Sequence, residues 1–256
     1  MTNQKLTDIS STGWLPKAAF GICVAVLLAG SVTPPVFADE AANDDLPTVQ
    51  IFQKVKNTYG SMITYSDEGC VVTARGTTIN FSTRLARTNF YLIEWQRVGE
   101  STYPATSAIG QAVWSSGAGD HLQTEAGVQF QGTREIALAH AAVYSVGATA
   151  TVPRMFFNLQ WQEVSIDDLE FSVTRLADEK VGEISCYVFT KGAMGATNTL
   201  WIGKQDFLIH QAQTVANMES MPAFTATETH TNMVLNRRFS RPDFVPSFPM
   251  LQSAED

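Results

Sequence analysis

Residues 78–98 read TINFSTRLARTNFYLIEWQRV and hold the clearest structural pattern in the chain. Ile79 and Phe81 alternate with polar residues, and a second alternating run follows in residues 89–98. Alternation with a period of two, in segments rich in branched and aromatic residues, is typical of β-strands with one buried face. The stretch therefore predicts two antiparallel strands joined by a short turn.

Runs of the same kind extend this strand pattern outward on both sides. Glycines and short polar stretches separate them, as expected of an antiparallel sheet with tight turns. Strands are predicted for residues 70–74, 78–83, 89–98, 111–115 and 119–125, and then for residues 170–177, 184–191, 197–203, 208–217 and 225–235.

Three segments change to helical spacing. Residues 48–62 place apolar side chains at intervals of three and four, which predicts one amphipathic helix. Residues 134–147 predict a second helix with Thr133 at its N-cap, and residues 153–159 a short third helix with proline in its first turn. The order helix, strands, helices, strands predicts an α+β fold in which one large antiparallel sheet carries helices on one face.

The N-terminal residues have the layout of a secretory signal peptide. Two lysines accompany an apolar run of 13 residues (18–30), and a cleavage site ending at Ala38 follows. The alternative is a membrane anchor, but a span needs roughly 20 apolar residues. We therefore expect residues 1–38 to be a cleaved signal peptide and residues 39–256 to form a single domain. The mature protein is expected in the periplasm, without a stable membrane span.

The charge of the chain restricts its partners. The whole chain has a formal charge of −8, and the expected mature chain has 15 Lys and Arg against 24 Asp and Glu. Its basic residues are scattered along the sequence rather than clustered. Nucleic acids and anionic membrane surfaces are therefore poor candidates as partners.

The expected mature chain keeps two cysteines, Cys70 and Cys186, both in strand-like runs. In an oxidising compartment such a pair can form a disulfide. The alternative is that both are small buried apolar residues, because the sequence does not fix whether their Cβ atoms meet. Neither cysteine has a histidine nearby, so no structural zinc site is predicted.

The sequence offers little catalytic chemistry. It has no zinc-protease, serine-hydrolase, P-loop or dinucleotide-binding motif. Adjacent acidic pairs such as Asp67-Glu68 and Asp167-Asp168 are typical of solvated turns. We therefore expect no enzymatic activity, no cofactor and no metal site. The four histidines lack ligands at metal-site spacing and are each expected to be surface or strand residues: His121, His140, His210 and His230.

Apolar side chains stand out instead. Residues 136–159 are unusually apolar and end in a cluster of Met and Phe, and several predicted strands carry tryptophan. Met and Phe often line sites for apolar ligands because their side chains adapt to ligands of varied shape. The alternative is that these side chains only fill the core. The candidate ligand-binding residues are Phe90, Leu92, Trp95, Trp114, Met155, Phe156, Phe157 and Trp201.

Three runs of the sequence carry a family resemblance: residues 64–73 (TYSDEGCVVT), 80–95 (NFSTRLARTNFYLIEW) and 199–209 (TLWIGKQDFLI). The third is similar to a hairpin of the form L-W-I-D-x-x-x-x-L-I. Together, in this order, they resemble the LolA-like superfamily of periplasmic lipoprotein carriers and their relatives, including the group called domain of unknown function 2092. The resemblance covers nearly all of the expected mature chain.

This resemblance implies an open half-barrel, in which a curved antiparallel sheet has helices as a lid over its concave face. It also implies that acyl chains or other lipids bind in the apolar concavity. In the carriers an arginine on the sheet helps to hold the lid, and Arg84 and Arg87 are the candidates here.

Two functions follow from these observations as hypotheses. The leading one is a non-catalytic periplasmic carrier or sensor of an apolar ligand, either a lipid or the acyl chains of a lipoprotein. The alternative is an interaction or regulatory module of the cell envelope, which uses the same fold to bind a protein partner without transporting lipid.

Overall fold

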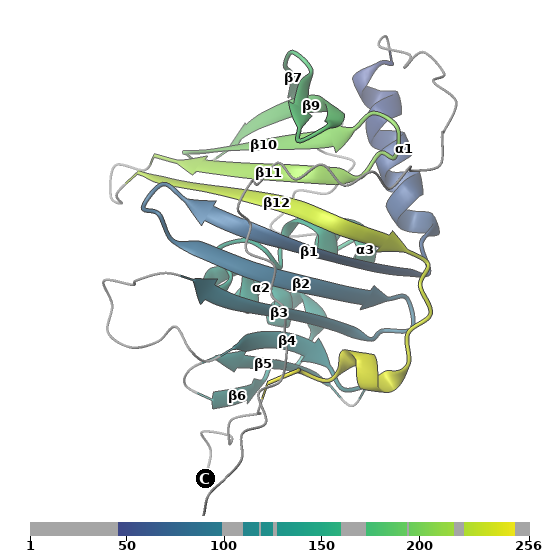
Figure 1. Cartoon of the computed structure of the whole chain (residues 1–256), viewed down its shortest axis with the longest axis vertical. Coiled ribbons are helices and arrows are strands. Elements are labelled where there is room, and N and C mark those ends of the chain that lie inside the picture. Colours follow the sequence, from purple (N-terminus) through teal and green to yellow (C-terminus); the bar gives the residue numbers. More distant parts are fainter. Residues whose placement is uncertain are drawn as a thin grey trace, which may run out of the picture. The chain divides into compact units, whose positions relative to one another are not determined.

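One antiparallel sheet organises the chain, which the computed structural model describes over residues 46–98, 110–117, 119–124, 127–159, 173–193, 195–217 and 223–248. Within these residues twelve strands join the sheet, in the order β6-β5-β4-β3-β2-β1-β12-β11-β10-β9-β7, and β8 pairs with β9. The first strand, β1, therefore lies beside the last, β12, in the middle of the sheet (Figure 1). The strands are β1 (Thr64–Thr73), β2 (Thr78–Ala86), β3 (Tyr91–Val98), β4 (Gln111–Ser115), β5 (Asp120–Thr124), β6 (Gly127–Phe130), β7 (Thr174–Arg175), β8 (Glu179–Val181), β9 (Ile184–Ala193), β10 (Ala196–Gly203), β11 (Ile209–Ala216) and β12 (Phe224–Leu235).

Helices cover one face of this sheet. α1 (Thr48–Ser61) buries a single apolar stripe that includes Phe52 and Tyr59. α2 (Arg134–Tyr144) begins at Thr133, whose hydroxyl accepts a hydrogen bond from a backbone N–H of the first turn. α3 (Thr151–Phe157) contacts α1, and α2 contacts β4 and β5. Figure 1 shows α2 and α3 behind the strands.

The strands separate an inner face, which the helices cover, from an outer face. Because side chains alternate along a strand, Ile93 and Trp95 of β3 enter the main core on the inner face, together with the buried residues of the three helices. Leu92, between Tyr91 and Ile93, points to the outer face. There it packs with Phe244 of the short 3-10 helix η1 (Arg241–Phe244). The C-terminal segment therefore covers part of the outer face.

The predicted fold class, α+β with one large antiparallel sheet and N-terminal and central helices, is confirmed. The sheet is open, with β6 at one edge and β7 at the other. Several element boundaries differ from the prediction. β1 begins at Thr64 rather than at residue 70, because its polar first half pairs with both β2 and β12. β6 and β8 are short strands that the pattern does not predict.

Some predicted features lie outside the described residues. These are the signal peptide (residues 1–38), the Asp167-Asp168 pair and the first three residues of the strand predicted for residues 170–177. In the rest of that predicted strand, only Thr174–Arg175 (β7) is a strand. All described residues belong to one compact unit, Ala38–Asp256. Among them, no helix combines the length and the apolar character needed to cross a bilayer.

Candidate functional site

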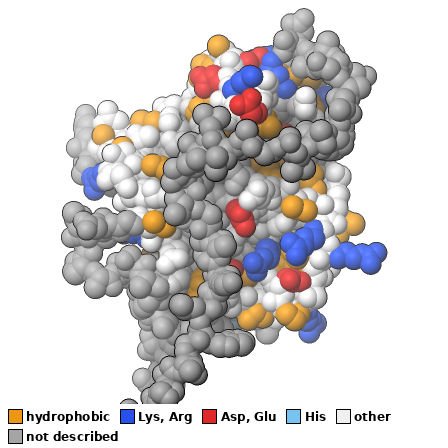
Figure 2. Space-filling model, viewed as in Figure 1, with side chains coloured by type: hydrophobic (Ala, Val, Ile, Leu, Met, Phe, Trp, Pro, Cys, Tyr) orange, Lys and Arg blue, Asp and Glu red, His pale blue; other side chains and the backbone are white. Residues whose placement is uncertain are grey.

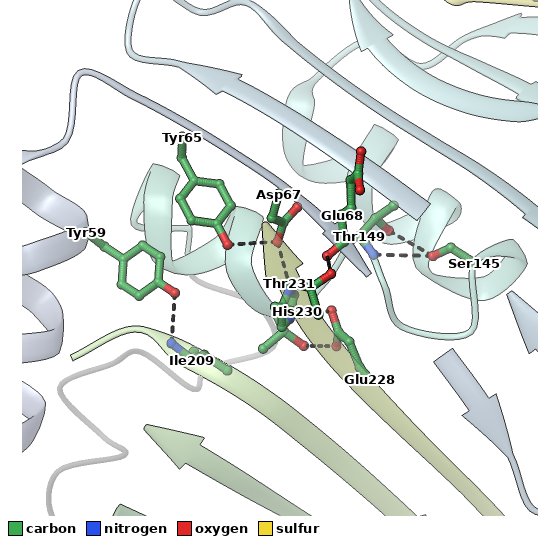
Figure 3. A network of polar contacts seen from close by, with 11 residues as sticks. Tyr59, Tyr65, Asp67, Glu68, Ser145, Thr149, Ile209, Glu228, His230 and Thr231 are labelled. Atoms are coloured by element: carbon green, nitrogen blue, oxygen red, sulfur yellow. Dashed lines mark hydrogen bonds and ion pairs between the residues drawn. The ribbon is translucent and has the colours of Figure 1, made fainter. Parts of the chain in front are cut away.

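A buried group of charged side chains lies on the inner face, where β1 pairs with β12 (Figure 3). Nδ1 of His230 donates a hydrogen bond to Oδ2 of Asp67 over 2.7 Å. Nε2 of His230 lies 3.1 Å from Oε1 of Glu228, an ion-pair contact. The hydroxyl of Tyr65 also donates to Oδ2 of Asp67, over 2.8 Å. Asp67, Glu228 and His230, here called the charged cluster, are each at most 5% exposed.

The register of the strands assembles the charged cluster. Gly69 of β1 lies opposite His230 of β12, and the ring of Phe81 from β2 lies against Gly69, which has no side chain to displace it. Phe81 meets the imidazole ring edge to face, with ring centroids 5.5 Å apart. An aromatic ring therefore seals the cluster and keeps water away from it.

The environment keeps His230 charged. Burial by itself lowers the pKa of His230, because it disfavours an imidazolium, but attraction to Glu228 and the hydrogen bond to Asp67 outweigh this effect. The pKa rises from its ordinary 6.5 to about 10. The ring is therefore an imidazolium at neutral pH, and it supplies the positive charge that two carboxylates need in the protein interior.

The charged cluster has the residue types of a catalytic pair but a different geometry. A general base needs a free ring nitrogen near a substrate proton, whereas both ring nitrogens of His230 face carboxylates. The hydroxyl of Thr151 donates to Oε2 of Glu228 over 2.6 Å. The cluster therefore links β1 and β12 to the first residue of α3. In the described part of the chain, no group of His, Cys, Asp and Glu is arranged to hold a metal ion.

One prediction about these residues is wrong. The sequence predicts a solvated turn at Asp67-Glu68, but Asp67 is buried in β1, where His230 and Tyr65 donate hydrogen bonds to its Oδ2. His230 lies in β12, in agreement with the expected strand position, and the carboxylates beside it are contacts that were not predicted. The sequence does indicate that Glu228 and His230 share a face, because these residues are two apart in a predicted strand. Asp67 is 163 residues away, where no local pattern reveals it.

A second feature is a cavity at the end of the sheet where β1 turns into β2. It measures about 370 Å³ and is here called the end cavity. Ala216 lies directly opposite Phe224. Phe224 is two residues before the core residue Ala226 in β12, so the two side chains point to the same face. Arg97 lies two residues after Trp95 and so faces the same side. The cavity thus lies on the inner face, and its lining is Thr73, Ala74, Arg75, Thr77, Arg97, Val146, Ala216, Ala223, Phe224 and Thr225.

Val146, just after α2, brings the helical layer to the end cavity. Its φ of 55° lies in the left-handed region, which costs an L-residue about 1–2 kcal/mol. Neighbouring hydrogen bonds hold this turn. Oγ of Ser145 accepts from the N–H of Thr149 over 3.3 Å (Figure 3). The hydroxyl of Thr149 donates to the carbonyl of Leu138 over 3.2 Å. Backbone strain of this kind is common at ligand sites.

The structure divides the eight predicted ligand-binding residues among three apolar clusters. Trp95 and Phe156 are buried in the main core, and Met155 and Phe157 pack against this core. Trp201 belongs to a small cluster with two residues of β9. None of the eight lines the end cavity, and residues from opposite faces cannot share one pocket. The other three pack on the outer face: Phe90, Leu92 and Trp114.

The two predicted lid arginines make different contacts. Arg87 donates to carbonyl oxygens at the end of α1, and its bond to the carbonyl of Tyr59 measures 2.7 Å. Its guanidinium also lies 4.4 Å from the ring centroid of Phe156 in α3. Arg87 thus joins both helices to the sheet. Arg84 is instead on the outer face, where it donates to the carbonyl of Asp243 over 3.0 Å.

Arg84 lies beside the C-terminal segment. Figure 2, which views the outer face, shows Lys and Arg side chains gathered on the side where η1 lies in Figure 1. The guanidinium of Arg241 lies 5.6 Å from the ring centroid of Phe90. Below the segment, the carboxylate of Glu94 accepts a hydrogen bond from the N–H of Ser247 over 2.6 Å. These contacts attach the segment to the sheet, so Arg84 holds η1 rather than the helices of the inner face.

No disulfide joins Cys70 to Cys186. Cys70 lies in β1 and Cys186 in β9, and the strands β12, β11 and β10 lie between them. Neighbouring strands are about 4.8 Å apart, whereas a disulfide needs Cα atoms within about 7 Å. Both side chains are buried, as the alternative expectation states. Burial raises the pKa of Cys186 to about 11, which makes its thiol poorly reactive.

Several solved structures resemble this chain in fold at low sequence identity. No family profile matches the sequence, and no curated protein matches it. A DUF1329 family protein from Desulfovibrio piger matches over 78% of this chain and 98% of its own, with 11% identity and a TM-score of 0.35. A putative outer membrane lipoprotein-sorting protein domain from Vibrio parahaemolyticus matches over 77% and 95%, with 10% identity and a TM-score of 0.33.

A third similar structure is the MucA/MucB complex of Pseudomonas aeruginosa. It matches over 79% of this chain, with 8% identity and a TM-score of 0.41. The chain spans 62% of the length of that structure's chain.

Proposed function

We propose that the protein is a non-catalytic carrier or sensor of the cell envelope, which binds the apolar chain of a lipid or of an acylated protein in the end cavity. The observation that carries the proposal is the cavity of about 370 Å³ between the inner face and Val146. Its volume falls within the range of about 300–1,000 Å³ of ligand pockets. The resemblance of three sequence runs to the LolA-like superfamily supports the same class of ligand.

Binding is confined to the end cavity, because the protein's own rings fill the inner face under α1 and α3. The ring centroids of Phe52 and Phe189 are 4.9 Å apart, and those of Phe156 and Phe157 are 5.0 Å apart. Each methylene buried in the cavity contributes roughly 0.8 kcal/mol. Six methylenes therefore contribute about 5 kcal/mol, before the cost of immobilising the chain.

Filling the cavity is the direct test. Ala216→Trp puts a large ring on the inner face and is expected to weaken binding of the neutral fluorescent probe N-phenyl-1-naphthylamine by at least about tenfold. Val215→Trp is the matched control, because Val215 is the adjacent residue of β11, points to the opposite face and is already exposed. It should change the affinity by less than about twofold. Equal effects of the two variants, or no binding by the unmodified protein, would refute the proposal.

The packing of the inner face favours a second candidate function. A half-barrel filled by its own side chains has little room for several acyl chains, so the same fold can act as an interaction module for an envelope protein. That function predicts a partner that copurifies with the Ala216→Trp variant as well as with the unmodified protein. A partner lost only with Ala216→Trp supports ligand-dependent sensing instead.

We also propose export to the periplasm through cleavage after Ala38. The basis is the apolar run at residues 18–30 and the small residue at the cleavage position. Intact mass spectrometry of the protein from a periplasmic fraction should give the mass of residues 39–256. A full-length mass in the cytoplasmic fraction would contradict this, and Ala38→Pro should block processing if the site is correct.

A further inference from the structure

We infer that the ligand of the end cavity is a single-chain lipid with an anionic oxygen head group, and that Arg75 and Arg97 hold this head group. The inference rests on the proposed function, since it assigns a chemical class to the ligand of the same cavity. It adds a head-group site to the apolar wall.

The charges of the lining carry the argument. Asp and Glu outnumber Lys and Arg in this chain, yet none of the ten lining residues is acidic, and two are arginines. Arg75 lies in the turn between β1 and β2, and Arg97 pairs with Ile79 at the start of β2. Within the described residues neither guanidinium forms an ion pair. Two such cations beside an apolar wall complement a carboxylate or phosphate, which arginine binds through paired hydrogen bonds.

The composition of the lining completes the description of an amphiphile site. Ala216, Ala223, Phe224 and Val146 form an apolar wall, while the arginines lie with threonines around the β1–β2 turn. Threonine hydroxyls can donate further hydrogen bonds to an anionic oxygen. The volume is at the lower end of the range for ligand pockets, which suits one chain rather than several.

The test compares ligands that share one alkyl chain and differ in charge. Decanoate, decyl phosphate, decanol and decyltrimethylammonium each compete with N-phenyl-1-naphthylamine on the delipidated protein. We expect the better of the two anions to bind at least about tenfold more tightly than decanol, and the cation to bind most weakly. The preferred anion identifies the head group as carboxylate or phosphate.

Variants then locate the head group. Arg75→Gln/Arg97→Gln should lower the affinity for the preferred anion to that for decanol and leave decanol binding unchanged. Arg237→Gln/Arg238→Gln removes the same charge from the exposed segment after β12 and should leave the preference intact. Equal binding of anions and decanol, or a preference that survives Arg75→Gln/Arg97→Gln, would overturn the inference while leaving the proposed function in place. Failure of all four ligands and of the probe would overturn the proposed function itself.

Discussion

His230→Ala is expected to lower the free energy of unfolding by about 3–5 kcal/mol. The substitution leaves the carboxylates of Asp67 and Glu228 buried without the imidazolium that lies between them. Breaking a buried ion pair from one side is strongly destabilising, because the remaining charge has neither water nor partner. Urea unfolding at neutral pH, followed by circular dichroism, measures the effect.

The pH dependence separates a charge effect from a packing effect. The pKa of His230 is raised to about 10 in the folded protein, compared with 6.5 ordinarily. Its contribution is therefore fully present below about pH 6.5, where both states are protonated, and declines as the pH rises towards about 10. Unfolding free energies near pH 6 and pH 9 should differ more for the unmodified protein than for His230→Ala.

A triple variant, Asp67→Leu/Glu228→Leu/His230→Phe, serves as the control. Apolar residues of similar volume can replace a buried charged group at little cost in stability, so this variant should be more stable than His230→Ala. Its free energy of unfolding should also fall less between pH 6 and pH 9 than that of the unmodified protein. A His230→Ala variant that is as stable as the unmodified protein, with the same pH dependence, would show that the cluster is not charged in the way described.

Gly69→Ala is expected to lower the free energy of unfolding by at least about 1–3 kcal/mol. A Cβ at this position would lie 2.3 Å from Cζ of Phe81 and 2.3 Å from the carbonyl oxygen of Thr229. The phenyl ring could move, but the carbonyl belongs to β12, which pairs with β1 over most of its length. Moving Phe81 would also disturb its contact with His230.

Gly60→Ala is the matched control for Gly69→Ala. Gly60 lies exposed near the end of α1, and a Cβ there would have no atom within 4 Å. Alanine in a helix is favoured over glycine by roughly 0.5–1 kcal/mol, so this substitution should stabilise the protein. Thermal and urea unfolding of the two variants should therefore shift in opposite directions. A shift in the same direction would contradict the close packing described at Gly69.

The secondary structure could be predicted because its signals are local. The alternation around Phe81 and the helical spacing of residues 48–62 depend on neighbours within a few residues, and the structure has strands and a helix there. The same alternation also shows that Leu92 and Trp95 lie on opposite faces of β3. The sequence alone therefore excludes a single pocket that contains both side chains. It does not show which face of the sheet the helices cover.

The charged cluster and the end cavity depend on tertiary structure. Asp67 meets His230 only because β1 and β12 are neighbours, with a register irregularity between Ser66 and Glu68. A shift of one residue would turn one of the two side chains to the other face. The end cavity likewise combines the β1–β2 turn, the ends of β3 and β11, the start of β12 and Val146. Periodicity along the chain thus determined the elements and their buried faces. Strand order and register decided which distant residues meet, because pairing between distant strands leaves no mark on the local sequence of either.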